Sequence, residues 1–112
     1  MDLTYIEIKE SSEDTYINSY ERRGKTLTDT FYSHLDDHIS HEECNFTEEL
    51  SVYVSFASIL IENKKDISFI VKEMLPLIKK ADTNKIKEEL NIADYKTFEN
   101  DLTLVKKYMV IT

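Results

Sequence analysis

The longest apolar stretch of the chain, residues 50–61, contains no charged residue. It carries two apolar stripes at helical spacing on opposite faces: Leu50, Val54, Ala57 and Ile61 on one, and Val52, Phe56 and Ile59 on the other. A helix that is apolar on both faces is usually enclosed by other elements. Asn45 or Thr47 can cap it and Glu48 and Glu49 suit its first turn. The pattern predicts a central helix that ends near Asn63, with a strand at residues 52–54 as the alternative.

Other segments show one apolar stripe each. Leu27, Phe31, Leu35 and Ile39 repeat every four residues, which predicts a helix capped by Thr26 or Thr28. Asp66 precedes a similar pattern over residues 67–78, in which Pro76 predicts a kink or a break near Leu75. A short helix is expected from Thr83, then a turn over residues 91–94. The last helix is expected from Tyr95, with an apolar stripe of Tyr95, Phe98, Leu102, Val105 and Met109.

The N-terminal segment is ambiguous. Residues 4–9 can form a short strand or the beginning of a helix. Ser11 and Ser12, followed by two acids, are typical of a helix start, and Gly24 is a natural C-terminal stop.

The composition favours helices over sheets. The 112-residue chain has one Gly and one Pro, whereas sandwiches and barrels need many tight turns rich in both. We therefore predict a mainly α fold: a compact single-domain bundle of five or six helices over residues 1–112, possible without metal or disulfide. A short N-terminal extended segment remains an alternative.

The charge is unevenly distributed along the chain. Residues 1–50 carry 13 acids and 4 bases, whereas residues 51–112 carry 9 acids and 10 bases, which together give the net charge of −8. Residues 26–63 contain no Lys or Arg. Such a surface attracts basic partners and repels nucleic acid, although acidity often serves solubility alone. The candidate partner-binding residues are Asp29, Tyr32, Asp36, Asp37, Glu42, Glu43, Glu48 and Glu49.

All three histidines, His34, His38 and His41, fall on one side of a helix, followed by Cys44. Imidazoles at i and i+4 can chelate a metal, so His34 and His38 are the pair to consider. A complete site needs ligands from facing helices, and no second histidine cluster exists. The favoured interpretation is a half-buried flank without metal or cofactor. Nearby acids are expected to raise the histidine pKa values.

No catalytic set is evident, so we do not expect an enzyme. Cys44 lies among glutamates that would raise its pKa, and thiolate chemistry also needs an orienting group and an oxyanion site. Asp36 and Asp37 are adjacent and diverge by about 100° on a helix. One glycine cannot build a phosphate-binding loop.

The spacing of residues 84–112 resembles a helix-turn-helix, which implies DNA binding by a small regulator. However, Glu99 and Asp101 are expected on the surface of the second helix. Residues 79–112 carry seven Lys and six acids, which is barely positive for a surface that must neutralise several phosphates.

The leading functional hypothesis is a non-enzymatic inhibitor of the immunity-protein or antitoxin type that docks a basic partner such as a nuclease toxin. A lone cysteine fits a reducing compartment, and the N-terminus shows no secretory signal. The apolar run is too short to span a bilayer, which needs about 20 residues. We therefore expect a soluble cytoplasmic protein without a membrane partner.

Overall fold

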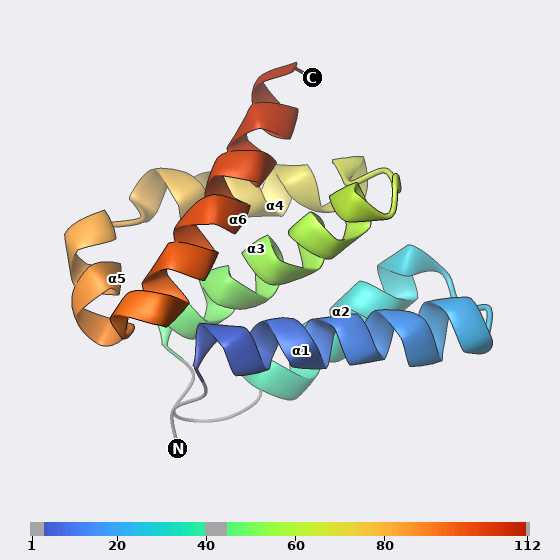
Figure 1. The fold of residues 1–112 in the computed structure, drawn as a ribbon. Helices are drawn as coiled ribbons and strands as arrows, with labels where there is room; N and C mark the ends of the chain where they lie inside the picture. Colours follow the sequence, from blue (N-terminus) through green and yellow to red (C-terminus); the bar gives the residue numbers. More distant parts are fainter. Residues whose placement is uncertain (1–3, 40–44, 112) are drawn as a thin grey trace.

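The computed structural model of the chain describes residues 4–39 and 45–111, in which the secondary structure is helical throughout (Figure 1). The elements are α1 (Tyr5–Thr15), the π-helical η1 (Tyr16–Arg22), α2 (Leu27–Ile39), α3 (Phe46–Glu62), α4 (Ser68–Lys80), α5 (Thr83–Glu89) and α6 (Ile92–Ile111). The Cα radius of gyration is 13.2 Å, the value of about 13 Å expected for a compact chain of this length. The predicted mainly α bundle is confirmed, and no described segment forms a strand.

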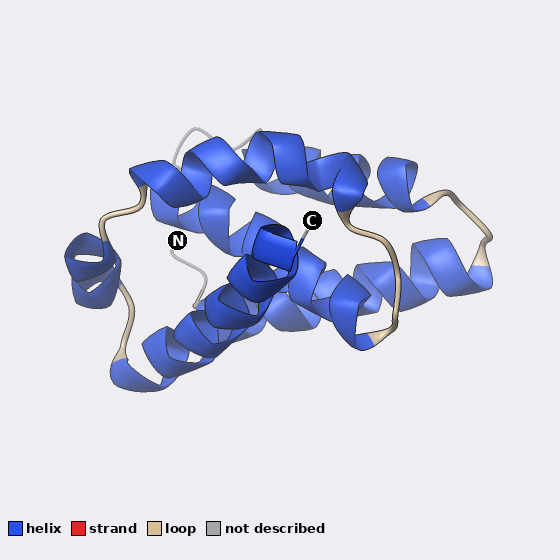
Figure 2. Ribbon diagram, turned by 90° about the horizontal axis from the view of Figure 1, so that it is seen from above, coloured by secondary structure: helices blue, strands red, loops and turns tan. Residues whose placement is uncertain are grey.

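Helix α3 is the centre of the bundle, as its two apolar faces predicted. Every residue from Leu50 to Ile61 is buried, and the helix packs against α1, α2, α4 and α6. Asn45 caps it by accepting a hydrogen bond from the Glu48 N–H at 2.8 Å. Short loops join the surrounding helices, as the view from above shows (Figure 2). The strand considered for residues 52–54 is wrong because these positions lie in the middle of α3.

The N-terminal segment is a helix and not a strand. Thr4 caps α1 by accepting from the Glu7 N–H at 3.2 Å. A second acceptor comes from α6, whose buried Asp94 Oδ1 accepts from the Ile6 N–H at 3.2 Å. Ser12, expected as a cap, is instead buried inside the helix. The helix alternative for residues 4–9 is therefore confirmed, with a local cap at Thr4 and a further contact from Asp94, 88 positions from Ile6.

The next boundary follows the predicted chemistry. Gly24 has a φ of 68°, a left-handed conformation that ends the η1 segment and favours glycine. Thr26 Oγ1 accepts a hydrogen bond from the Asp29 N–H at 3.0 Å and begins α2. In this helix Phe31 and Leu35 are buried, whereas Ile39, the last member of the predicted stripe, is exposed.

Pro76 lies inside α4 without breaking it. Proline has no backbone N–H, so the carbonyl one turn earlier lacks its helical hydrogen bond. Because Pro76 is exposed, water can hydrate that carbonyl. Asp66 accepts hydrogen bonds from the backbone and hydroxyl of Ser68 at the start of the helix. The break predicted near Leu75 is therefore wrong, and Asp66 stabilises the start of α4 although the N-cap position itself is Ile67.

Helix α5 begins at Thr83 as predicted, whereas α6 begins three residues earlier than predicted. Asp82 caps α5. Asn91 accepts a hydrogen bond from the Asp94 N–H at 2.8 Å, so α6 begins at Ile92 and the predicted turn over residues 91–94 is mostly helical. Phe98 packs edge to face on Tyr5 of α1, with ring centroids 5.3 Å apart. None of the described helices is long and apolar enough to cross a membrane.

Candidate functional site: an acidic face on α1 and α2

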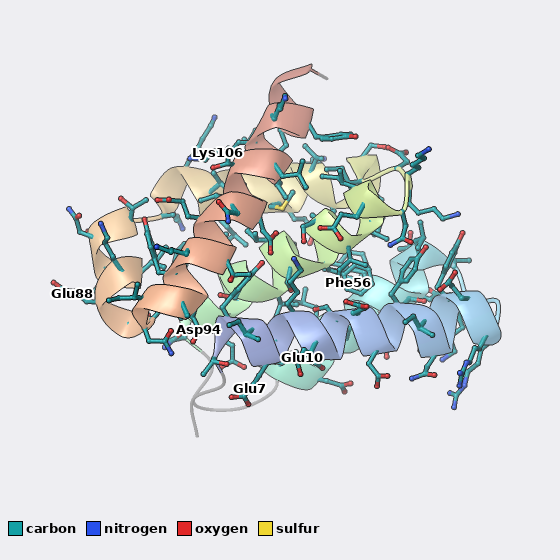
Figure 3. The ribbon with its side chains drawn as sticks, in the orientation of Figure 1. Glu7, Glu10, Phe56, Glu88, Asp94 and Lys106 are labelled. Carbon is teal, nitrogen blue, oxygen red and sulfur yellow. The ribbon has the colours of Figure 1, made fainter. Side chains whose placement is uncertain are left out.

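Seven exposed carboxylates lie on the neighbouring helices α1 and α2. We define this acidic face by Glu7, Glu10, Glu13 and Asp14 on α1 and by Asp29, Asp36 and Asp37 on α2. The opposite sides of both helices are buried against the bundle, which fixes the direction of the carboxylates. Figure 3 shows Glu7 and Glu10 on the outer side of α1, away from Phe56 in the core. The acidic face is thus held by two rigid helices.

The only lysine or arginine within α1 and α2 is turned away from this face. Lys9 Nζ lies 3.1 Å from Asp101 Oδ1 and 3.0 Å from Asp101 Oδ2 on α6. Glu62 Oε1 at 3.9 Å is a weaker second partner of Lys9. Because Lys9 is committed to Asp101, neither helix offers a cation that would neutralise the acidic face.

Asp101 itself corrects a prediction. It was expected on the exposed side of the last helix, but it is only 6% exposed. Its Oδ2 accepts a 2.6 Å hydrogen bond from the Tyr5 hydroxyl, which is also buried. Burial, reinforced by the charge of Asp101, raises the pKa of Tyr5 far above its usual value, so the phenol remains a donor. Tyr5, Lys9 and Asp101 therefore form a buried polar cluster that joins α1 to α6.

The predicted partner-binding residues do not form one surface. Asp29, Asp36 and Asp37 belong to the acidic face. Glu48 and Glu49 are half-buried at the start of α3, and Glu48 Oε2 lies 3.1 Å from His38 Nδ1. Glu42 and Glu43 lie outside the described residues.

The Tyr32 side chain contacts helix α4. Its hydroxyl donates to Glu73 Oε1 on α4, and the Tyr53 hydroxyl donates to Glu73 Oε2 at 3.2 Å. Partial burial and then this carboxylate raise the pKa of Tyr32 to about 12. Tyr32 therefore anchors α2 to α4, one helical turn before Asp36 on the same side of α2.

His34 and His38 are buried between α1, α2 and α3. His34 Nε2 lies 2.9 Å from the Ser12 hydroxyl and its Nδ1 lies 3.4 Å from the Thr15 hydroxyl. The two imidazoles meet nearly at right angles with ring centroids 4.9 Å apart. Burial, and then the neighbouring His38, lower the pKa of His34 to about 4 although Asp37 opposes the shift. The predicted upward shift is wrong for His34 because desolvation outweighs the acidic surroundings.

This arrangement offers no ready chemistry. Ser12 is fully buried and His34 lacks a carboxylate partner on Nδ1, so the pair does not form a nucleophilic triad. Within residues 4–39 and 45–111, no group of three or more potential ligands converges as a metal site would require. His41 and Cys44, the other members of the predicted stripe, lie outside these ranges. His34 and His38 therefore make polar contacts with buried or half-buried side chains inside the bundle.

The comparisons with known proteins add no relationship: no family model, curated protein or solved structure shows a significant match to the chain. The properties of the acidic face are therefore derived from its own geometry.

Sequence reasoning missed the four acids of α1, although a signal for them was present. The excess of acids over residues 1–50 included Glu7, Glu10, Glu13 and Asp14. With α1 starting at Tyr5, these residues fall on the side opposite Tyr5, Ile8 and Ser12. If the helix is assumed to start at Ser11, Glu7 and Glu10 lie outside it, and the shared side of the four acids cannot be recognised.

We expect the stability of the protein to fall between pH 7 and pH 5 because His34 is buried neutral. The pKa of His34 is about 4 in the fold and about 6.5 in an unfolded chain. The unfolded state thus binds a proton first as the pH falls, and about 2 kcal/mol is lost over this interval. Urea unfolding of the native chain and of His34→Gln at both pH values measures the effect. The variant should lose about 2 kcal/mol less, whereas equal losses would exclude His34 as the cause.

Proposed function

We propose that this chain is a non-enzymatic binding module whose acidic face docks a basic protein, as a small inhibitor of the immunity-protein or antitoxin type docks a nuclease toxin. One observation carries the proposal: seven exposed carboxylates occupy two adjacent helices whose single lysine is turned inward onto Asp101. A solvated charged surface usually mixes both signs. The one-sided arrangement is what a positive cleft would recognise.

The physical advantage of such a face lies mainly in the rate of encounter. Complementary fields raise association rates from about 10⁵–10⁶ M⁻¹s⁻¹ to as much as about 10⁸–10⁹ M⁻¹s⁻¹ at low salt. An enzyme that binds RNA or DNA presents a positive cleft to phosphates. A rigid acidic helix pair can occupy that cleft without itself carrying catalytic groups. The proposed target is a basic protein of the cytoplasm.

Charge reversal on the acidic face should abolish this docking. The test variant is Glu10→Lys, Glu13→Lys, Asp36→Lys. The matched control is Glu88→Lys, Glu89→Lys, Glu99→Lys, which changes the net charge equally at exposed positions of α5 and α6. Affinity capture from extracts of the source cells should retain basic proteins on the native chain and on the control but not on the test variant. With a captured partner, the test variant should associate at least tenfold more slowly and with a weaker dependence on salt.

The comparison with the control makes the result decisive. If the test variant captures the same proteins as the native chain, the acidic face is not the docking surface. If both variants lose capture equally, net charge is responsible and the specific face is rejected. If only the test variant loses capture, an assay of the captured protein's nuclease activity distinguishes an inhibitor, which lowers that activity, from an adaptor, which does not.

A second candidate, a DNA-binding regulator, gains from the burial of Asp94 and Asp101. Residues 79–112 carry seven lysines and six acids, and the two buried acids no longer contribute to the surface. That surface is therefore more positive than the sequence count implied. A gel shift with genomic fragments at low salt separates this candidate from the first. DNA binding is favoured if the native chain retards the fragments and the acidic-face variant retards them equally.

A further inference from the structure

The side of the bundle opposite the acidic face is rich in lysine. We define the lysine face by Lys64 before α4, by Lys72, Lys79 and Lys80 on α4, and by Lys106 and Lys107 on α6, all of which are exposed or partly exposed. None of the six forms an ion pair with another described residue. In Figure 3, Lys106 and the pair Glu7 and Glu10 lie at opposite ends of the view. On this side of the bundle the six exposed lysines outnumber the exposed acids Asp66 and Glu73 at and before α4.

The lysine face contains a hollow between α4 and α6. The hollow measures about 340 Å³, and its lining is both apolar and polar: Ile67, Val71 and Tyr108 on the one hand, and Lys65, Asp66, Ser68 and Lys72 on the other. Lys65 also lies over the Tyr20 ring at 5.3 Å, so Lys72 is the lining lysine without a described partner. Leu75, one turn further along α4, is 39% exposed. With two lysines against the single carboxylate of Asp66, the lining is net positive, which suits a ligand that combines carboxylates with an apolar side chain.

The acidic face of the same molecule has this composition. Ile6 is 38% exposed and Ile17 is 36% exposed, and both belong to the helical segment that carries Glu10 and Glu13. Ile6, Glu10, Glu13 and Ile17 are spaced by four, three and four residues, which is the spacing of one side of a helix. The segment thus presents carboxylates flanked by exposed isoleucines, whereas a nucleic-acid backbone has no such apolar group.

We propose that a second copy of this chain is the occupant: the acidic face of one molecule, centred on α1, docks on the lysine face of the next, with an isoleucine in the hollow beside Tyr108. The complementarity is in charge as well as in apolar contact, because the six lysines meet the four carboxylates of α1. Since two different faces meet, the contact is head to tail and leaves one face open at each end. The association also covers the acidic face, so a basic partner competes with it.

Sedimentation of the purified chain tests the proposal without any other protein. At low salt the weight-average mass should rise with concentration. Raising the ionic strength from about 0.01 M to about 0.15 M shortens the Debye length from about 30 Å to about 8 Å and should return the chain to monomer. The acidic-face variant Glu10→Lys, Glu13→Lys, Asp36→Lys should remain monomeric. A lysine-face variant, Lys72→Glu, Lys79→Glu, Lys106→Glu, should also remain monomeric.

Mixing the two variants provides the sharpest result. Each retains one native face, so an equimolar mixture should form a 1:1 complex that cannot extend, while the Glu88→Lys, Glu89→Lys, Glu99→Lys control should self-associate like the native chain. None of the substituted side chains is buried, and circular dichroism verifies that the helices persist. A native chain that stays monomeric at low salt overturns the proposal. Self-association of either single-face variant, or no complex in the mixture, does so as well.

Discussion

Replacing Phe56 by alanine is expected to destabilise the protein by about 3–5 kcal/mol, the usual loss for a buried phenylalanine. Phe56 is 0% exposed in the middle of α3. Its ring centroid lies 5.2 Å from that of Phe31 and 5.8 Å from that of His34. Truncation removes these contacts and leaves a cavity that helices fixed on all sides of α3 cannot fill. Urea unfolding monitored by circular dichroism measures the change.

The control for this substitution is Ile92→Ala. Ile92 is 79% exposed at the start of α6, so its loss should change the free energy of unfolding by less than about 0.5 kcal/mol. Comparable effects of the two substitutions would mean that the centre of the core does not lie at α3.

Replacing Asp101 by alanine is expected to cost about 3–5 kcal/mol for a different reason. Asp101 accepts hydrogen bonds from the Tyr5 hydroxyl and from Lys9 Nζ, so its removal leaves two donors without an acceptor, one of them charged. The Lys9 side chain is 23% exposed, and rehydration of its ammonium group places the loss at the lower end of this range. Differential scanning calorimetry or urea unfolding gives the value.

Three variants show whether the polar cluster is responsible. Tyr5→Phe removes one donor and leaves the ion pair, so it should cost about 1–2 kcal/mol. Glu99→Ala removes an exposed carboxylate from the same helix and should stay within about 0.5 kcal/mol. The double variant Lys9→Met, Asp101→Leu should recover part of the loss because no buried charge remains unpaired. A double variant less stable than Asp101→Ala would contradict this account.

The apolar pattern predicted the architecture well because burial at helical spacing is a local property. Leu50, Phe56 and Ile61 identify α3 by their spacing in the sequence alone, and the near absence of glycine and proline excludes most β folds. Boundaries with local capping, such as those at Asn45 and Thr26, were also predictable. A side chain that bonds to a neighbouring backbone amide leaves its signature within three residues.

The residues whose burial, bonding partner or pKa was not predicted depend on contacts between distant parts of the chain. Nothing near Asp101 in the sequence shows that Tyr5 and Lys9 will enclose it, and nothing near Ile6 identifies Asp94 as an acceptor. His34 was likewise expected to have a raised pKa, since its neighbours in sequence are acidic, whereas its neighbours in space include hydroxyls and aromatic rings. Charge and burial compete at these positions, and only the tertiary structure shows that burial prevails.

The bonds between α1 and α6 also determine when the protein can finish folding during its synthesis. Tyr5, Ile6 and Lys9 have their acceptors 88 to 96 positions later, so a ribosome exposes α1 long before those acceptors emerge. At about 5–20 residues per second, this interval lasts several seconds. During this time the apolar side of α1 has only α2 and α3 to cover it. The nascent chain is therefore most exposed to aggregation and proteolysis just before α6 is released, and a chain stopped before Asp94 should be degraded faster than the 112-residue chain.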